Sequence, residues 1–175
     1  MKLETLLKKL DYTLDAGDLN AEVASLEYDS RKVSKGSLFV CLTGFRADGH
    51  EYIPAAVAAG ATALVVEREV SAPAGVTVIR VKDSRYALAL LSAAWFGHPA
   101  EKMTVIGLTG TKGKTTTAHM VKSILEAAGH KVGMIGTVGA VIGKELLQTK
   151  NTTPEPPPHF HYCNHNWYKT RWRRP

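Results

Sequence analysis

Hydrophobic and polar residues alternate along the first half of the chain in short blocks that predict helices and strands. Leucines spaced three and four residues apart predict an amphipathic helix over residues 1–11. Short apolar or β-branched runs predict strands at 23–28, 37–42, 63–66 and 76–81, and periodic stretches predict helices at about 50–59 and at 84–96. Strands that alternate with helices predict an α/β layer architecture.

A second α/β pattern follows the break at Pro99. The apolar run Met103–Leu108 predicts a buried strand, and apolar residues at helical spacing from Ala118 to Ala128 predict a helix. A further strand at 131–135 and a hairpin at 138–147, turning at Gly143-Lys144, complete the pattern. A sheet of this kind normally has about five parallel strands, so this stretch predicts an incomplete domain.

The sequence therefore divides into three predicted parts. Residues 1–98 form an N-terminal α/β domain, 99–155 an incomplete ATP-binding domain, and 156–175 a tail that we expect to be disordered and foreign to the fold. The tail holds five of the thirteen aromatic residues and three of the seven histidines, without helical or strand periodicity. Such a change of composition is unusual within one fold.

The turn between the strand and the helix of the second part has the composition of a phosphate-binding loop. Its residues are Gly110, Thr111, Lys112, Gly113, Lys114, Thr115 and Thr116. Glycines let several N–H groups point at one anion, and the helix N-terminus adds partial positive charge. Lys114 would contact the outer phosphates of ATP and Thr115 would reach Mg²⁺. The full Walker spacing needs glycine at 108, where this chain has Leu108, so the match is to a shorter form.

Three other polar segments are weaker candidates. Asp29-Ser30-Arg31 closes a predicted strand, and Phe45 and Arg46 in a glycine-flanked loop could stack on and hydrogen-bond a planar base. Asn151, Thr152, Thr153 and Glu155 lie in a loop after the phosphate-binding unit, where Glu155 could bind Mg²⁺. Each segment also fits an ordinary surface turn. The alternating His159, His161, Cys163 and His165 of the tail could bind zinc, although no supporting packed context is evident.

Charge and cysteine content narrow the function classes. The net charge is +6, but four tail cations account for most of it and leave +2 for residues 1–155. We therefore expect no nucleic-acid partner. The two cysteines indicate no disulfide framework, and Cys41 lies in an apolar run typical of a buried position. The N-terminal helix is too short and too charged for a signal peptide or a membrane span, which favours a cytoplasmic protein without membrane insertion.

Together these segments resemble the Mur ligase family of peptidoglycan synthesis. The resemblance extends to about Glu155 and rests on four segments in order: Asp29-Ser30-Arg31, Gly36–Gly44 followed by Asp48-Gly49-His50, Gly110–Thr116, and Asn151–Glu155. The first two are shared with the branch that adds the terminal dipeptide (MurF type). The stretch from Gly133 to Gly143, followed by Thr-Thr-Pro-Glu, is similar to the tripeptide-forming branch (MurE type).

The resemblance implies a Mur-ligase-type α/β domain followed by an incomplete P-loop domain. It also implies an ATP- and Mg²⁺-dependent ligase that joins an amino acid to UDP-N-acetylmuramoyl-L-alanyl-D-glutamate through an acyl phosphate. We expect the chain to be a monomer. Implied substrate contacts are Ser30, Phe45, Arg46, Ala47, Asn151, Thr152 and Thr153; implied metal ligands are Thr115 and Glu155; Lys114 is the implied catalytic residue. The family's remaining domains are missing, so little or no turnover is expected from this chain alone.

Other interpretations remain open from the sequence. The chain could be a non-catalytic UDP-sugar-binding fragment, or a non-enzymatic protein whose basic aromatic tail binds nucleic acid or metal. It could also be a stand-alone P-loop NTPase or kinase, although the missing strands argue against this interpretation.

Overall fold

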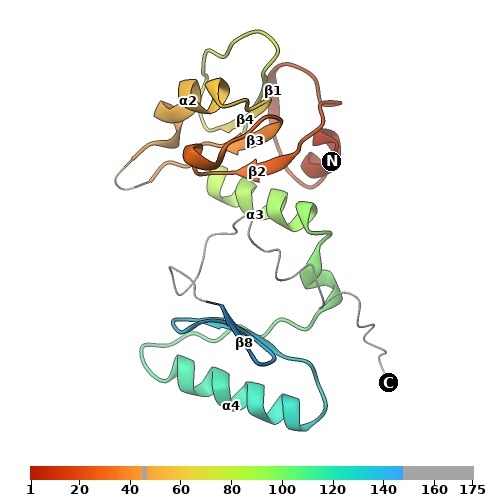
Figure 1. The fold of residues 1–175 in the computed structure, drawn as a ribbon, viewed down its shortest axis with the longest axis vertical. Coiled ribbons are helices and arrows are strands. Elements are labelled where there is room, and N and C mark those ends of the chain that lie inside the picture. The colour runs from red at the N-terminus through yellow and green to blue at the C-terminus, as the bar shows by residue number, and fades with distance from the viewer. Residues whose placement is uncertain (45–46, 148–175) are drawn as a thin grey trace. The chain divides into compact units, whose positions relative to one another are not determined.

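The computed structural model describes residues 1–44 and 47–147 and divides into two compact units, one of residues 1–103 and one that begins at Thr104. The first unit is built on a five-stranded sheet with the order β1-β5-β4-β3-β2 (Figure 1). Its strands are β1 (Thr13–Ala16), β2 (Ser25–Glu27), β3 (Ser37–Val40), β4 (Ala63–Val66) and β5 (Thr77–Arg80). The predicted α/β class is confirmed.

Strands β2 to β5 run parallel to one another, so their carboxyl ends share one edge of the sheet. The four strands predicted from the sequence are these four. Strand β1 was not predicted; it pairs antiparallel with β5 at the opposite side of the sheet from β2. All four of its residues are exposed, so it carries none of the one-sided apolar alternation that marks a half-buried strand.

Helices cover both faces of this sheet, with α2 and α3 on opposite sides (Figure 1). The α-helices are α1 (Leu3–Leu7), α2 (Ile53–Ala58) and α3 (Ser84–Trp95), and the short 3₁₀ helices are η1 (Ser30–Lys32), η2 (Gly49–Tyr52) and η3 (Pro99–Lys102). In β3, Leu38 and Val40 face a core shared with α1 and α3. Phe39, and Cys41 just after the strand, face a core shared with α2. Burial on both faces explains why β3 and β4 are continuous apolar runs.

Cys41 is fully buried, as predicted from its apolar neighbours. Burial raises the pKa of its thiol to about 12. A thiol with so little thiolate character is a packing group and not a nucleophile.

The second unit contains α4 (Lys114–Ala127), β6 (Gly133–Gly136), β7 (Gly139–Ile142) and β8 (Glu145–Leu147). The three strands form an antiparallel sheet in sequence order. The predicted hairpin is confirmed, and its turn contains Gly143, whose φ of 57° is a left-handed value that glycine adopts without strain.

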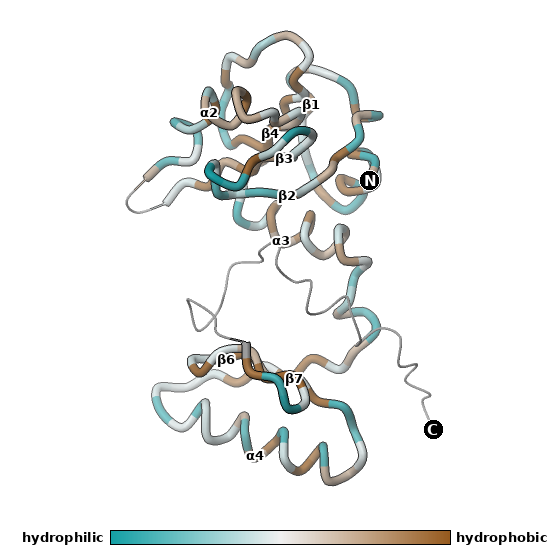
Figure 2. Tube along the Cα trace, in the orientation of Figure 1, coloured by the Kyte–Doolittle hydropathy of each residue, from teal (hydrophilic) through white to brown (hydrophobic). Residues whose placement is uncertain are grey.

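The predicted buried strand over Met103–Leu108 is wrong. Among the described residues this segment pairs with no strand, and the side chains of Val105 and Ile106 are 70% and 56% exposed. A parallel strand is stabilised by neighbours in its sheet, and here β6, β7 and β8 pair only with one another. Figure 2 shows hydrophobic residues along β6 and β7, yet Met134 is the one buried hydrophobic residue in the described part of this unit.

Candidate functional site

The carboxyl edge of the parallel sheet gathers polar side chains from four consecutive connections. Ser30 follows β2, Thr43 follows β3, Glu67 follows β4, and Ser84 begins the helix after β5. In open α/β sheets, ligands bind outside the carboxyl ends of the strands. The fold of the first unit therefore brings these four residues to the edge where a ligand is expected.

The turn after β2 is organised by an ion pair between Asp29 and Arg31. The Asp29 carboxylate accepts hydrogen bonds from Arg31 Nε at 2.8 Å and Arg31 Nη2 at 2.7 Å, and from the Arg31 backbone N–H at 3.1 Å. The hydrogen bonds and charge of Arg31 lower the pKa of Asp29 to about 2. Ser30 lies between the paired residues, and its hydroxyl has no hydrogen-bond partner among the residues that the structure describes.

The connection after β3 forms a closed neck, which consists of Thr43, Gly44, Ala47 and Asp48. Thr43 and Asp48 form an antiparallel bridge, and the Gly44 N–H donates to the Ala47 carbonyl at 3.1 Å. Just outside the neck in the sequence, where Leu42 precedes Thr43 and Gly49 follows Asp48, the Gly49 N–H donates to the carbonyl of Leu42 at 2.8 Å. The neck brackets residues 45 and 46, two predicted substrate contacts that lie outside the described residues.

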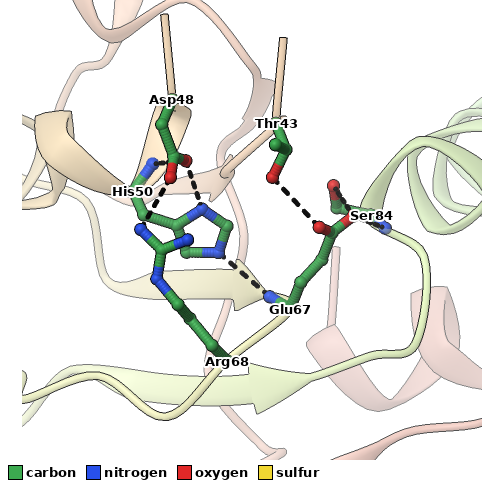
Figure 3. A network of polar contacts seen from close by, with 6 residues as sticks. All are labelled: Thr43, Asp48, His50, Glu67, Arg68 and Ser84. Carbon is green, nitrogen blue, oxygen red and sulfur yellow. Dashed lines mark hydrogen bonds and ion pairs between the residues drawn. The ribbon is translucent and has the colours of Figure 1, made fainter.

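Asp48 anchors the second side of the neck. Its carboxylate accepts from the His50 backbone N–H at 3.0 Å and from Arg68 at 2.6 Å, and lies 2.6 Å from His50 Nδ1 (Figure 3). The His50 backbone hydrogen bond is the largest of the effects that hold the pKa of Asp48 well below its usual range. Asp48 thus stays ionised wherever the protein is folded near neutral pH, and it ties the neck to the residue that follows Glu67.

The predicted phosphate-binding loop lies in the second unit and leads directly into α4. Helix α4 begins at Lys114, with Gly113 as its N-cap at φ 77° and no acidic residue in its first turn. Lys114 Nζ donates to the Gly110 carbonyl at 2.6 Å. The side chains of residues 110–117 are exposed, so the N-terminal turn of α4 is open to an anion.

Two family models match the chain. One, described as "Mur ligase family, catalytic domain", matches residues 22–96, and the other, "Mur ligase middle domain", matches residues 108–162. The chain belongs to the Mur ligase family.

Similar proteins agree with this assignment. The chain is 46% identical over 155 residues to a UDP-N-acetylmuramoyl-L-alanyl-D-glutamate–2,6-diaminopimelate ligase of Clostridium perfringens, a match covering 89% of this chain and 32% of that protein. The similarly named ligase of Geobacillus thermodenitrificans is 47% identical, with 89% and 31% covered. A crystal structure of MurF from Acinetobacter baumannii superimposes with a TM-score of 0.59 at 30% identity, covering 79% of this chain and 30% of that one.

The chain thus spans about a third of the length of the Mur ligases that it matches. Ser30, Ala47 and residues 110–116 lie in the parts that the two family models cover. Phe45, Arg46, Asn151, Thr152, Thr153 and Glu155, and the alternating histidines of the tail, lie outside the described residues.

No role was predicted from the sequence for Glu67, Arg68 or His50, although His50 belongs to the Asp48-Gly49-His50 segment of the resemblance. A signal was present for Glu67, because it is a charged residue placed directly after a continuous apolar strand. In the described parts of the chain no three His, Cys, Asp or Glu side chains gather into a metal-binding cluster. No helix of those parts is long and apolar enough to cross a lipid bilayer.

Proposed function

We propose that this chain binds UDP-N-acetylmuramoyl-L-alanyl-D-glutamate at the carboxyl edge of its first unit and ATP with Mg²⁺ at the loop of its second. It would do so as part of a tripeptide-forming ligase that adds an amino acid to the dipeptide. The observation that carries this proposal is the identity of 46–47% along most of the chain to ligases named for that substrate.

The geometry of the first unit supports the UDP part of the proposal. The Ser30 hydroxyl is available to a ligand because Asp29 and Arg31 satisfy each other. The Arg31 side chain is 86% exposed, and the guanidinium N–H groups that Asp29 does not use would donate to a diphosphate close to the turn. Ala47, on the neck after the adjacent strand, approaches the same edge and would provide a backbone contact.

The second unit supports the nucleotide part. Residues Gly110 to Thr116 would hold the phosphates of ATP, because positive φ values at Gly110 and Gly113 shape a loop that larger residues would strain. Lys114 would exchange its contact with the Gly110 carbonyl for phosphate oxygens, and the Thr115 hydroxyl would bind Mg²⁺. ATP would supply the phosphoryl group that makes the substrate carboxylate reactive toward an amine.

The remaining predicted contacts belong to the same proposal. Asn151, Thr152 and Thr153 would contact the muramoyl-peptide, and Glu155 would be a second Mg²⁺ ligand. The proposed substrates are water-soluble, which favours a cytoplasmic location. The monomeric state stays a prediction.

Isothermal titration tests the proposal. We expect the folded chain to bind UDP-N-acetylmuramoyl-L-alanyl-D-glutamate, and Ser30→Ala to weaken binding about fivefold to tenfold, the effect of one lost hydrogen bond. The exposed Ser71→Ala is the matched control and should bind as the parent does. Absence of binding by the folded parent would contradict the proposal.

The similarity to MurF makes the dipeptide-adding branch the second candidate. That branch acts on the tripeptide-bearing nucleotide, so the same titration with UDP-N-acetylmuramoyl-tripeptide separates the two. Tighter binding of the tripeptide form would favour the MurF-type assignment.

A further inference from the structure

Glu67 joins two elements of the carboxyl edge through one carboxylate (Figure 3). Its Oε1 accepts from the Ser84 backbone N–H at 2.8 Å and from the Ser84 hydroxyl at 2.7 Å. Its Oε2 accepts from the Thr43 hydroxyl at 3.0 Å. The N-terminus of α3 favours an anion, and Ser84 N–H is one of the donors that the helix itself leaves unpaired. Glu67 thus binds the start of α3 to the first residue of the neck.

The backbone of Glu67 holds the other side of the neck. Its N–H donates to His50 Nε2 at 3.0 Å, so Nε2 must be the unprotonated ring nitrogen. Nδ1 therefore carries the proton and donates to Asp48, 2.6 Å away. Thr43 and Asp48, which face each other across the neck, are both fixed with respect to Glu67.

The charge of Glu67 suits this role. Burial raises the pKa of its carboxyl, but the hydrogen bonds from Ser84 and Thr43, with a smaller contribution from His50, outweigh that effect and lower it. The carboxylate consequently remains ionised and accepts hydrogen bonds near neutral pH. The Ser84 side of the contact is buried, whereas Thr43 is exposed, so the bond to Thr43 lies at the boundary with solvent.

We propose that Glu67 is a positioning residue for the substrate, holding the neck of Thr43, Gly44, Ala47 and Asp48 in the arrangement that receives the UDP group. It acts through Thr43 and His50 and does not itself touch the ligand. This inference rests on the proposed function, because the neck carries the predicted contact Ala47.

Three variants separate the parts of the network. Glu67→Ala removes every side-chain bond, and Thr43→Val removes only the hydroxyl that reaches Glu67 while keeping a similar shape. Glu67→Gln should preserve the contacts with Ser84 and Thr43. Its carbonyl oxygen can accept both Ser84 bonds, and its NH₂ can donate to the Thr43 hydroxyl, which also accepts.

Two controls accompany these variants. Glu69→Ala removes an exposed carboxylate two residues further along the same segment. Ile79→Val removes one methyl group from the core formed with α1 and α3, lowering stability without touching the network.

The readouts are the dissociation constant for UDP-N-acetylmuramoyl-L-alanyl-D-glutamate and the hydrogen-exchange rates of the Gly44 and Gly49 amides. We expect Glu67→Ala to weaken binding about tenfold and Thr43→Val about threefold, both with faster exchange at the neck. Glu67→Gln should bind within about twofold of the parent, as should both controls.

The outcomes distinguish the inference from the proposed function. A folded parent that does not bind overturns both. A parent that binds, with Glu67→Ala binding equally well, overturns the positioning role alone. Equal weakening by Ile79→Val also overturns it, because the effect would then follow stability and not the neck.

Discussion

The ammonium group of Lys114 lies 2.6 Å from the carbonyl oxygen of Gly110, four residues earlier in the chain. The Lys114 cation therefore contacts the loop in which we propose that the phosphates of ATP bind. We predict that Lys114→Met weakens binding of ATP with Mg²⁺ by about tenfold to a hundredfold, as expected for a lost charged hydrogen bond. Fluorescence titration with a labelled ATP analogue measures this.

Lys112→Met is the matched control, since it removes the same charge from an exposed position in the same loop. Its effect should be smaller, because Lys112 is not the residue that opens α4. Equal loss in the two variants would mean that the loop contributes only its net charge.

Glu27 should make the stability of the first unit depend on pH. Its side chain is buried at 7% exposure, and Oε2 has no hydrogen-bond partner among the described residues. Burial raises the pKa of this carboxyl above its ordinary value of 4.5, with opposing contributions from Lys32 and Ser25. The folded state therefore holds the proton more tightly than the unfolded chain, so this group lowers stability as the pH rises from 4.5 through the folded-state pKa.

We predict that Glu27→Gln raises the free energy of unfolding by about 1 kcal/mol at about pH 8, with the gain disappearing near about pH 4. Urea denaturation at the two pH values measures the gain. The exposed Glu22→Gln should change neither value. A gain of equal size at both pH values would show that the charge of Glu27 is not the cause.

A side chain at Gly49 should destabilise the folded first unit. A Cβ atom there would lie 2.6 Å from the backbone nitrogen and 2.9 Å from the backbone oxygen of Leu42. Neither atom can move without disturbing the segment that directly follows β3. We predict that Gly49→Ala lowers the free energy of unfolding by about 1–3 kcal/mol, the usual cost of overpacking.

Gly107→Ala provides the comparison for this experiment, because a Cβ atom at Gly107 would meet nothing within 4 Å. Thermal unfolding followed by circular dichroism compares the two variants. Equal stability of Gly49→Ala and the parent would contradict the close approach of Gly49 to the backbone of Leu42.

The predictable parts of the fold are those in which local pattern and tertiary environment agree. The runs at 37–42 and 63–66 are apolar on both faces because both faces of β3 and β4 are covered, so their sequences indicate strands directly. The run Met103–Leu108 has the same kind of pattern but pairs with no strand in the described part of the chain, and pattern alone cannot supply hydrogen-bonding partners.

The candidate site also has one part that the sequence predicts and one part that it does not. Glycine-rich composition predicts the loop at 110–116, because the residues proposed to bind phosphate are adjacent in the sequence. The network around Glu67 depends on Thr43, His50 and Ser84, which come together only when parallel strands place their carboxyl ends at one edge. No short motif encodes that arrangement.

Chemical-shift mapping of the ¹⁵N-labelled chain with UDP-N-acetylmuramoyl-L-alanyl-D-glutamate tests the central claim most directly. Binding at the carboxyl edge predicts that the amides of Ser30, Gly44 and Ala47 shift on titration, whereas those of β1 do not. Shifts confined to β1, to α1 or to the tail would contradict the account, as would a spectrum that the ligand leaves unchanged.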